Sequence, residues 1–373
     1  MDALLCSDNQ LTSLDLSYFP VLRYLNCSNN KLTTLNASNK STLTQLYCQN
    51  NTLLTMLNCY SDNLTSLNVT GCTALKELRC YYNANLEIIT GLADCTAITY
   101  LDCEDCAITS LSGVNNMTNI ATLLARNNKF SGTFFLTNKS KLQNVRLSGN
   151  TLLTRVDCYS NPVLTSIDVS GCSAMTNLNV YNNNLSSINV SGCSVLYDFS
   201  CRQNQLTSLN LSGCPKLSKL YCYDNQLSAL NLSNCPELVL LYCYMNKISG
   251  SGMTTLVNSL PTRSASEKGV LRAIFNTGEN NSMTAAQITT ARNKYWLPYS
   301  YNGSTWVEMT ASTRGDVDGN GNVNISDVTA LIDYLLSGNA SGINVSAADC
   351  DQNGAINISD VTALIDYLLS GHW

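Results

Sequence analysis

Oxygen-bearing side chains recur at alternate positions in two short stretches near the end of this 373-residue chain. The first stretch contains Asp316, Asp318, Asn320, Asn322, Asn324 and Asp327, and the second contains Asp349, Asp351, Asn353, Ala355, Asn357 and Asp360. These are positions 1, 3, 5, 7, 9 and 12 of a twelve-residue loop that surrounds Ca²⁺ with roughly six to eight oxygens, position 7 offering its backbone carbonyl. The spacing therefore predicts two bound Ca²⁺ ions.

Both loops lead into the same fifteen-residue segment, NISDVTALIDYLLSG, which occupies residues 324–338 and 357–371. Its apolar residues recur at helical spacing and predict one helix with an apolar stripe after each loop. The stripe consists of Val328, Leu331, Ile332 and Leu335 in the first copy and Val361, Leu364, Ile365 and Leu368 in the second. Ser326 and Ser359 stand where a helix N-cap is expected. We expect no helix before either loop, because 310–315 is typical of a linker and 339–345 is rich in Gly, Ser and Asn.

The charge of this region favours a metal-dependent fold. From Gly315 onward there are eight carboxylates and no lysine or arginine, which gives a formal charge of −8 before any ion binds. Self-repulsion loosens a small domain, and two short helices bury only a small core. We therefore expect calcium to supply much of the folding free energy. All 21 lysines and arginines precede Gly315 with 18 of the 26 acidic residues, a balance of about +3.

This loop-then-helix arrangement, present twice, resembles a type I dockerin, the small domain by which bacterial secreted enzymes and scaffolds attach to cohesin domains. The resemblance covers roughly residues 315–373. It implies a small all-α calcium-binding domain of two loop–helix (F-hand) repeats, a cohesin-like or other scaffold partner, and an extracellular location, secreted or at the cell surface. Near-identity of the two halves implies two equivalent partner-binding faces.

In the dockerin family the partner contacts loop positions 10 and 11 and a pair of residues on the following helix. On this chain the matching positions are Ile325, Ser326, Ile332 and Asp333 in the first half and Ile358, Ser359, Ile365 and Asp366 in the second. Well-known members carry a hydroxyl pair and basic residues at these positions, whereas this chain carries Ile-Ser and Ile-Asp.

Upstream, a motif recurs with a period near 21 residues, as in LRYLNCSNNKL and LSKLYCYDNQL. It resembles the leucine-rich repeat signature and predicts an α/β-type solenoid dominated by β structure. One position forms a ladder of small apolar residues: Cys6, Cys27, Cys48, Cys59, Cys80, Cys103, Ala125, Leu147, Cys158, Val180, Cys201, Cys222 and Cys243. An asparagine usually follows three residues later, and we expect its amide to satisfy backbone groups where the coil turns.

Two features of the repeats leave alternatives open. The ladder steps by only eleven residues at Cys48→Cys59 and at Leu147→Cys158. Either a half-coil is skipped there or the register shifts. The second half of each coil, as in LTSLNVTGC, is expected to be extended or irregular, because Ser and Thr outnumber helix formers.

These patterns predict four segments. They are a leucine-rich repeat solenoid over residues 1–260 with its N-terminal cap missing, a C-terminal α+β cap over 261–309, a linker over 310–315 and a dockerin over 316–373. Within the cap we expect a strand over 269–276, a helix over 284–294 and strands over 295–302 and 305–309. Neither a signal peptide nor a membrane-spanning segment is recognisable.

Little in the sequence supports catalysis. The single histidine is His372, no phosphate-binding glycine motif is present, and basic clusters suited to nucleic acid are missing. Asp102 and Glu104 are close enough in sequence to form a glycosidase pair, yet acids two apart on a strand are more often solvated surface. Most of the eighteen cysteines occupy the ladder or the SGC turn of the second half-coil. We interpret them as buried hydrophobes, with zinc or redox chemistry at Cys103 and Cys106 as the alternative.

The outward positions that flank the ladder vary and contain most of the tyrosines. Tyrosine and arginine on a rigid strand array are enriched at binding hot spots, although tyrosines also simply suit strands. The predicted ligand face consists of Tyr60, Tyr81, Tyr159, Tyr181, Arg202, Tyr221, Tyr223, Tyr242 and Tyr244. The favoured function is a non-catalytic secreted binding protein whose repeats hold a protein or glycan. An accessory carbohydrate-binding component of a polysaccharide-degrading, cellulosome-like complex is the second possibility, and an enzyme is the third.

Overall fold

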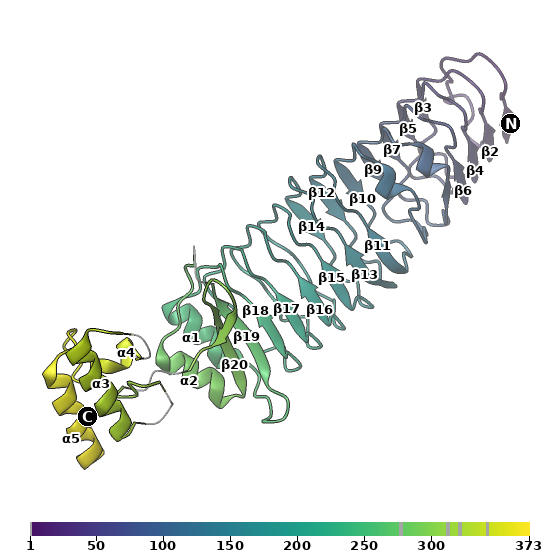
Figure 1. Ribbon diagram of the computed structural model, residues 1–373. Coiled ribbons are helices and arrows are strands. Elements are labelled where there is room, and N and C mark those ends of the chain that lie inside the picture. The colour runs from purple at the N-terminus through teal and green to yellow at the C-terminus, as the bar shows by residue number, and fades with distance from the viewer. Residues whose placement is uncertain (1, 276–278, 311–313, 320–322, 341–342) are drawn as a thin grey trace.

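The computed structural model describes residues 2–275, 279–310, 314–319, 323–340 and 343–373. Most of the chain forms an elongated stack of coils, and a small group of helices follows near the C-terminus (Figure 1). Neighbouring coils pair as parallel strands in register, as the pairings of Leu25 with Leu46 and Leu220 with Leu241 show. The leucine-rich repeat solenoid predicted from the sequence is thus confirmed.

Strand positions lie on two opposite sides of each coil. The first side carries β1 Ala3–Leu5, β2 Tyr24–Asn26, β4 Gln45–Tyr47, β6 Ser66–Asn68 and β8 Ile89–Thr90. After one coil without a strand, it continues with β11 Gly132–Phe135, β13 Leu153–Asp157, β15 Asn177–Asn179, β16 Asp198–Ser200, β17 Lys219–Tyr221 and β18 Leu240–Tyr242 (Figure 1). The opposite side carries β3 Thr34–Asn36, β5 Met56–Asn58, β7 Glu77–Arg79, β9 Tyr100–Asp102, β10 Thr122–Leu124, β12 Asn144–Arg146 and β14 Ser166–Asp168.

The two eleven-residue steps are transfers of the cysteine motif between these sides. Cys48 follows β4 on the first side, whereas Cys59 follows β5 on the opposite side. The motif returns when Leu147, which follows β12, is succeeded by Cys158, which follows β13. At each step one second half-coil is missing, so two half-coils that carry the motif follow one another. Some second half-coils are strands in their own right, namely β3, β6 and β14, so this half is extended as expected.

The interior of the rod is filled by one continuous apolar core. A single coil illustrates its density, since seven side chains of the coil that starts at Leu217 are almost fully buried. They are Leu217, Leu220, Cys222, Leu227, Leu230, Leu232 and Cys235. Each full burial of such a leucine contributes about 1.5–3 kcal/mol relative to exposure. Two short 3₁₀ helices, η1 Leu92–Asp94 and η2 Val114–Asn116, replace extended chain in the middle coils.

The cysteines are buried free thiols, as the sequence predicts, with only Cys6 partly exposed. Burial raises the pKa of Cys27 and of Cys158 to about 12, so these thiols stay protonated at neutral pH. Cys72 differs, because its contact with Cys48 lowers its pKa. Cys103 and Cys106 are both buried, and burial raises the pKa of each, which disfavours the thiolate that zinc or redox chemistry needs.

The asparagine ladder satisfies backbone groups between coils, which confirms the prediction. Asn183 accepts a hydrogen bond from Asn161 N at 2.9 Å and donates to Cys158 O and Val180 O, both at 2.8 Å. Asn225 makes the same kind of bonds one coil on from Asn204. Sequence reasoning ended the ladder at Asn246, but Asn281 adds a further rung, bonding Ile248 N, Cys243 O and Ala273 O.

Asp62 occupies a rung where an amide is wanted. Its Oδ1 accepts from Lys40 N at 2.6 Å, while its buried Oδ2 has no hydrogen-bond partner among the described residues. An asparagine would donate a hydrogen bond from that position, and an ionised carboxylate cannot. Burial accordingly raises the pKa of Asp62 to about 7.

The substitution Asp62→Asn should stabilise the protein at pH 8 and change little at pH 4. Because the folded-state pKa is raised, the stabilisation from the bound proton is complete below about pH 4 and is lost as the pH rises through about 7. We expect a gain on the order of 2 kcal/mol at pH 8, measured by urea unfolding at both pH values. The reverse change, Asn51→Asp, should create the same pH dependence, and equal gains at both pH values for Asp62→Asn would contradict this account.

The end of the solenoid is closed by helices and by further strands of the same sheet. These are α1 Gly250–Ser259, β19 Gly269–Ile274, α2 Ala285–Asn293, β20 Trp296–Tyr301 and β21 Trp306–Glu308. The strands and the helix expected in the cap are thereby confirmed, with residue 276 outside the described residues. Helix α1 was not predicted and replaces a second half-coil. Gly252 permits its close approach, because a Cβ there would lie 2.0 Å from Ser228 O.

The C-terminal region contains α3 Ile325–Ser337, α4 Val345–Ala348 and α5 Ile358–Ser370. Helices α3 and α5 pack together over a small core that includes Val328, Leu331, Val361 and Leu364. The single-turn α4 lies where no helix was expected. Among the described residues, no helix is long and apolar enough to cross a membrane.

Candidate functional site

Three carboxylates from each acidic loop converge. Oxygens of Asp316, Asp318 and Asp327 lie within 4.8 Å of one another, and those of Asp349, Asp351 and Asp360 do the same. Asp327 and Asp360 are fully buried, and Asp316 is almost so. Buried carboxylates this close repel one another strongly unless a cation lies between them.

The donor set fits a hard divalent cation such as Ca²⁺. Buried Oδ1 of Asp349 has no hydrogen-bond partner among the described residues, while its Oδ2 accepts from Gly354 N at 3.0 Å. An unsatisfied buried oxygen is costly unless something binds it. The clustered ligands are carboxylate oxygens, which suit Ca²⁺ better than softer metals.

The helices that follow hold the last carboxylate of each loop in place. Asp327 accepts from Asp318 N at 3.0 Å and from Asn324 N at 2.8 Å, and Asp360 is bonded in the same way. The N-caps are Asn324 and Asn357, each in a capping box, and the prediction of Ser326 and Ser359 as caps was therefore wrong. An amide accepts from a helix N–H at least as well as a serine hydroxyl does, and each cap lies one residue before its helix begins.

Both serines turn toward the acidic loops instead. Ser326 Oγ donates to Asp318 Oδ2, and Ser359 Oγ donates to Asp351 Oδ2. The Ser359 hydroxyl lowers the pKa of Asp351. These bonds orient carboxylates that sequence reasoning assigned to the metal.

The remaining predicted metal ligands are not among the carboxylates that converge in each loop. Asn320 and Asn322 lie outside the described residues. In the second loop, Asn353 donates to Asp351 Oδ2 at 2.7 Å and accepts from Ala355 N at 2.9 Å, and Ala355 O accepts from Asn357 at 3.3 Å. The side-chain Oδ1 of Asn357 accepts from Ser359 N and caps α5, so a contact from position 9 to an ion would run through water, as it often does at that position.

The outward surfaces of α3 and α5 expose large apolar side chains. Ile325 is 70 % exposed and Ile358 is 71 % exposed. Ile332 and Ile365 are exposed to a smaller extent, and Asp333 and Asp366 are exposed beside them. Sequence reasoning missed Leu336 and Leu369, which are 81 % and 82 % exposed and extend the same surfaces. Helical spacing from Ile332 and Ile365 was the signal that could have found them.

The ends of this region meet. Trp373 stacks on Tyr367 with ring centroids 4.3 Å apart. The Arg314 guanidinium lies 4.1 Å from the Trp373 ring centroid. Arg314 also donates to Cys350 O at 2.6 Å. Gly315 packs against Trp373 so closely that a Cβ would lie 2.7 Å from its ring.

On the solenoid, most of the predicted ligand residues form one column along the first side. Tyr159 stacks on Tyr181 at 4.4 Å, the Arg202 guanidinium lies 4.3 Å from the Tyr181 centroid, and Tyr223 stacks on Tyr244 at 4.4 Å. Arg202 donates to the Tyr223 hydroxyl and so joins the two pairs. Tyr221 and Tyr242 form a second row beside this column, with centroids 5.2 Å apart.

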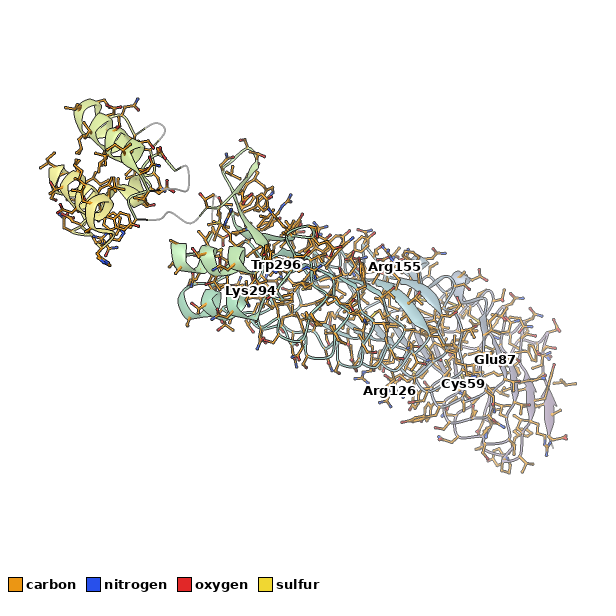
Figure 2. All side chains as sticks on the ribbon, turned by 90° about the horizontal axis from the view of Figure 1, so that it is seen from below. Cys59, Glu87, Arg126, Arg155, Lys294 and Trp296 are labelled. Carbon is orange, nitrogen blue, oxygen red and sulfur yellow. The ribbon has the colours of Figure 1, made fainter. Side chains whose placement is uncertain are left out.

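Tyr60 and Tyr81 do not belong to this surface. They stack on each other at 4.6 Å but follow β5 and β7, on the opposite side of the rod. The single face inferred from the sequence is therefore wrong, because the cysteine motif changes sides twice. Figure 2 shows that the two sides of the rod are separate. Arg126, which follows β10, and Arg155, on β13, lie at opposite edges of the rod.

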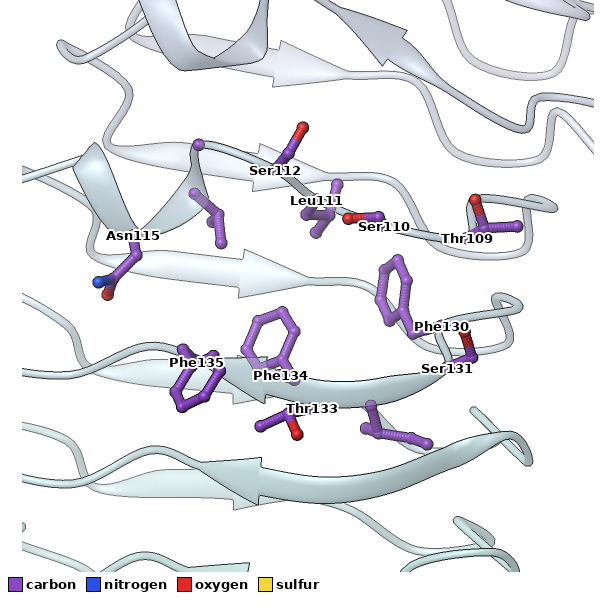
Figure 3. A pocket seen from close by; sticks show the side chains of 13 residues that line it. Thr109, Ser110, Leu111, Ser112, Asn115, Phe130, Ser131, Thr133, Phe134 and Phe135 are labelled. Atoms are coloured by element: carbon purple, nitrogen blue, oxygen red, sulfur yellow. The ribbon is translucent and has the colours of Figure 1, made fainter.

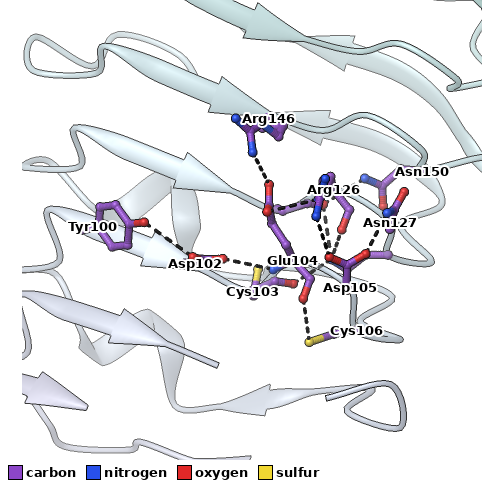
Figure 4. A network of polar contacts seen from close by, with 12 residues as sticks. Tyr100, Asp102, Cys103, Glu104, Asp105, Cys106, Arg126, Asn127, Arg146 and Asn150 are labelled. Atoms are coloured by element: carbon purple, nitrogen blue, oxygen red, sulfur yellow. Dashed lines mark hydrogen bonds and ion pairs between the residues drawn. The ribbon is translucent and has the colours of Figure 1, made fainter. Parts of the chain in front are cut away.

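The opposite side carries an ion-pair network centred on Glu104 (Figure 4). Glu104 is paired with Arg126 and Arg146, each at 3.1 Å, and Arg126 also reaches Asp105 at 3.0 Å. Burial raises the pKa of Asp102 to about 6. With both Glu104 oxygens held by guanidinium groups, the structure favours a scaffold role for the Asp102–Glu104 pair over glycosidase chemistry.

A separate hollow of about 220 Å³ interrupts the first side at the coil without a strand (Figure 3). Its floor is apolar, with Phe130 and Phe134 buried and 6.1 Å apart, and its rim carries Ser110, Ser112 and Thr133. None of the residues singled out from the sequence lines it. It ends the strand ladder between β8 and β11.

Comparison with known protein families gives a match to one part of the chain. Residues 314–369 match the dockerin type I domain. Dockerin type I domains bind calcium and occur in extracellular proteins, and the acidic clusters described above fit that chemistry. No significant match was found among curated proteins.

Several solved structures are similar to the solenoid. The functional domain of InlJ from Listeria monocytogenes, described as including a cysteine ladder, is 26 % identical over 74 % of this chain and 69 % of that chain, with a TM-score of 0.28. The internalin InlF from Listeria monocytogenes is 18 % identical over 82 % and 87 %, with a TM-score of 0.32. YopM from Yersinia enterocolitica is 20 % identical over 67 % and 61 %, with a TM-score of 0.26. These TM-scores are low, so the solenoid rests on the coils and ladders described above.

Proposed function

We propose that this chain, which carries a type I dockerin domain after a leucine-rich repeat solenoid, is a non-catalytic extracellular binding protein, secreted or held at the cell surface. Its repeats recognise a protein or glycan, and its dockerin attaches it to a cohesin-like partner or surface scaffold. One observation carries the proposal: two acidic loops converge their carboxylates within a dockerin match, each followed by a helix that exposes apolar side chains.

The dockerin is proposed to hold two Ca²⁺ ions. Asp316, Asp318 and Asp327 would bind one, and Asp349, Asp351 and Asp360 would bind the other. Each ion would offset two of the three negative charges in its cluster. The capping boxes and the two serine hydroxyls fix those carboxylates in position, so the loops and helices become ordered together.

The partner is proposed to bind the outward surfaces of α3 and α5. Each surface offers an isoleucine at the helix start and an isoleucine and a leucine further along, and the sequences of the two helices are identical. Exposed apolar side chains of this size mark a protein-binding surface. Identical surfaces on two helices would let one partner bind through either half.

This proposal predicts a difference between a variant of one half of the dockerin and a variant of both halves. Ile325→Asp combined with Leu336→Asp should leave capture of a cohesin module within about threefold of wild type, because the other half remains. The four-residue variant that adds Ile358→Asp and Leu369→Asp should weaken capture about a hundredfold or more, since each buried large apolar side chain is worth about 1.5–3 kcal/mol.

The measurement is capture of purified cohesin modules by the immobilised full chain, in calcium and in chelator. Leu53→Asp with Leu152→Asp serves as a control that makes the same kind of change at exposed apolar residues of the solenoid, away from α3 and α5. Capture of no module in calcium, or equal capture in chelator, would overturn the proposal. Equal loss from the variant of one half and the variant of both halves would refute the two-surface arrangement.

The second candidate function is an accessory carbohydrate-binding component of a polysaccharide-degrading complex. It is favoured by one specific observation, the aromatic column and the groove beside it, which lie on consecutive coils of the first side. It uses the same dockerin attachment and differs only in what the repeats bind. Binding of a soluble polysaccharide by the full chain, lost in the variant Tyr223→Ala with Tyr244→Ala, would support it.

A further inference from the structure

A long groove runs along the first side of the solenoid beside the aromatic column. It consists of two adjoining hollows of about 480 and about 510 Å³ that share Tyr242 and Arg272. Its lining begins at Arg155 on β13 and reaches Tyr299 on β20, so it crosses seven consecutive strands of one sheet. At a strand spacing of about 4.8 Å, the groove is about 30 Å long. This length and direction suit a linear polymer that lies along the rod.

The aromatic column leaves ring edges, rather than ring faces, for a ligand. Beyond Tyr223 and Tyr244 the column continues to Phe275 at 5.4 Å and from there to Tyr301 at 4.8 Å, with ring planes 21° and 4° apart. Each inner ring is therefore covered on both sides by its neighbours. A neutral sugar is normally held by stacking its flat face on an exposed aromatic ring, but the ring faces of this column are largely covered by neighbouring rings. The tyrosine hydroxyl groups and the charged side chains of the groove are therefore the groups that can recognise a ligand.

Two arginines in the groove carry charge that no carboxylate compensates. Among the described residues, neither Arg202 nor Arg272 forms an ion pair, whereas Arg155 pairs with Asp157 at 2.8 Å. The Arg272 guanidinium lies 4.4 Å from the Tyr242 centroid and 4.7 Å from the Trp306 centroid. Stacking of this kind holds the guanidinium plane and leaves its N–H edge for a planar anion, which it binds through two parallel hydrogen bonds.

The acidic residue in the lining does not cancel these charges. Asp198 faces Lys219 and Arg155, whose positive charges oppose the rise in its pKa that burial causes. Arg202 and Arg272 thus remain as the two available cations, three coils apart along the groove. So modest an excess of positive charge matches a ligand with one carboxylate per unit better than a densely sulfated one.

Backbone geometry favours a polysaccharide over a peptide. The inner strands that the groove crosses are hydrogen-bonded on both sides, so a ligand lying across them cannot add a β-strand. An extended peptide advances only about 3.3 Å per residue, whereas the groove repeats about every 4.8 Å. A pyranose unit in an extended polysaccharide advances by nearly one such repeat. The side chains of Asn179 and Ser200 on the groove floor supply polar partners for sugar hydroxyls.

We propose that this groove binds a linear polyuronate, whose carboxylates pair with Arg202 and Arg272 and whose hydroxyls bond to the tyrosine edges and the groove floor. This inference rests on the proposed function, because it names the ligand of the repeat surface. It selects an anionic polysaccharide and excludes its uncharged counterpart.

The test is calorimetric titration of the full chain with a soluble oligogalacturonate and with its fully methyl-esterified form, which keeps the backbone and removes the charge. We expect binding of the acid and none of the ester. Arg202→Gln and Arg272→Gln should each weaken binding roughly tenfold, as expected for loss of a charge-assisted hydrogen bond. Arg79→Gln is the matched control, since Arg79 lies 5.2 Å from the Tyr100 centroid on the opposite side of the rod.

Each other outcome overturns the inference. Equal binding of the acid and the ester would show that binding does not depend on the carboxylate charge. Unchanged affinity in both groove variants would show that the ligand binds elsewhere on the protein. Tighter binding of polyglutamate than of oligogalacturonate would assign the groove to an acidic polypeptide. No binding of any of the three would reject an anionic polymer. Calcium-dependent cohesin capture by the same variants is measured in parallel, so failure of the attachment role and failure of the polyuronate assignment are told apart.

Discussion

Replacement of Asp327 and Asp360 by asparagine should leave the C-terminal region unfolded in calcium while the solenoid stays folded. Both carboxylates are fully buried and lie within 4.8 Å of two further aspartates in their loops. The change keeps side-chain shape but removes one charge from each site, so the affinity for a divalent cation should fall at least a hundredfold, about 3 kcal/mol per ion. Cohesin capture should be lost with the fold.

Calorimetric unfolding of the full chain measures this directly. In wild type, the transition of the C-terminal region should gain about 1.4 kcal/mol per bound ion for each tenfold increase in free calcium. The single variant Asp327→Asn should lower the calcium stoichiometry from two to one. Asp333→Asn with Asp366→Asn removes the same charge at exposed positions and should leave the transition calcium-dependent. A transition that is the same in chelator and in calcium would exclude the metal-dependent fold.

Loss of one asparagine rung should destabilise the solenoid severely. Asn183 is buried and makes three hydrogen bonds to the backbone of two neighbouring coils. Asn183→Ala leaves the Asn161 N–H and the Cys158 carbonyl without partners in the interior, whereas Val180 O keeps its bond from Asn204, and we expect a cost of about 3–5 kcal/mol. Because coils contact only their neighbours, the damage should be local.

Urea unfolding together with amide hydrogen exchange tests this prediction. Exchange should rise mainly in the coils around residues 158–204 and little in the first coils. Asn184→Ala is the matched control, because Asn184 is the adjacent residue of the same type and its side chain is exposed. A loss of less than about 1 kcal/mol in Asn183→Ala, or the same loss in both variants, would show that the rung is not structural.

Local spacing made much of the molecule predictable. A 21-residue period predicts parallel coils, because only stacking can bury the apolar side of each repeat, and the cysteine and asparagine ladders follow from that stacking. Loop spacing likewise identified the aspartates that converge, since alternate positions of a tight turn face one point.

What the sequence could not reveal depended on three-dimensional register. An eleven-residue step looks like an irregularity in a linear pattern, yet it moves Tyr60 and Tyr81 to the side opposite Tyr159 and Tyr181. The cap residues were misassigned because Asn324 and Ser326 are both good N-caps and only backbone angles decide between them. Helix α1 was missed because it interrupts a repeat with residues that are weak helix formers.

The change of sides at Cys48–Cys59 and its reversal at Leu147–Cys158 give the rod a front and a back with separate content. The cysteine motif lies on the same flank in the opening coils and in the coils that carry Tyr159, Tyr181, Tyr223 and Tyr244. The Glu104 ion-pair network lies on the opposite flank. Two partners can therefore bind the two flanks of the rod without contacting each other. Because each step reflects a missing half-coil, removing one further half-coil there would move every later surface side chain to the opposite flank of the rod.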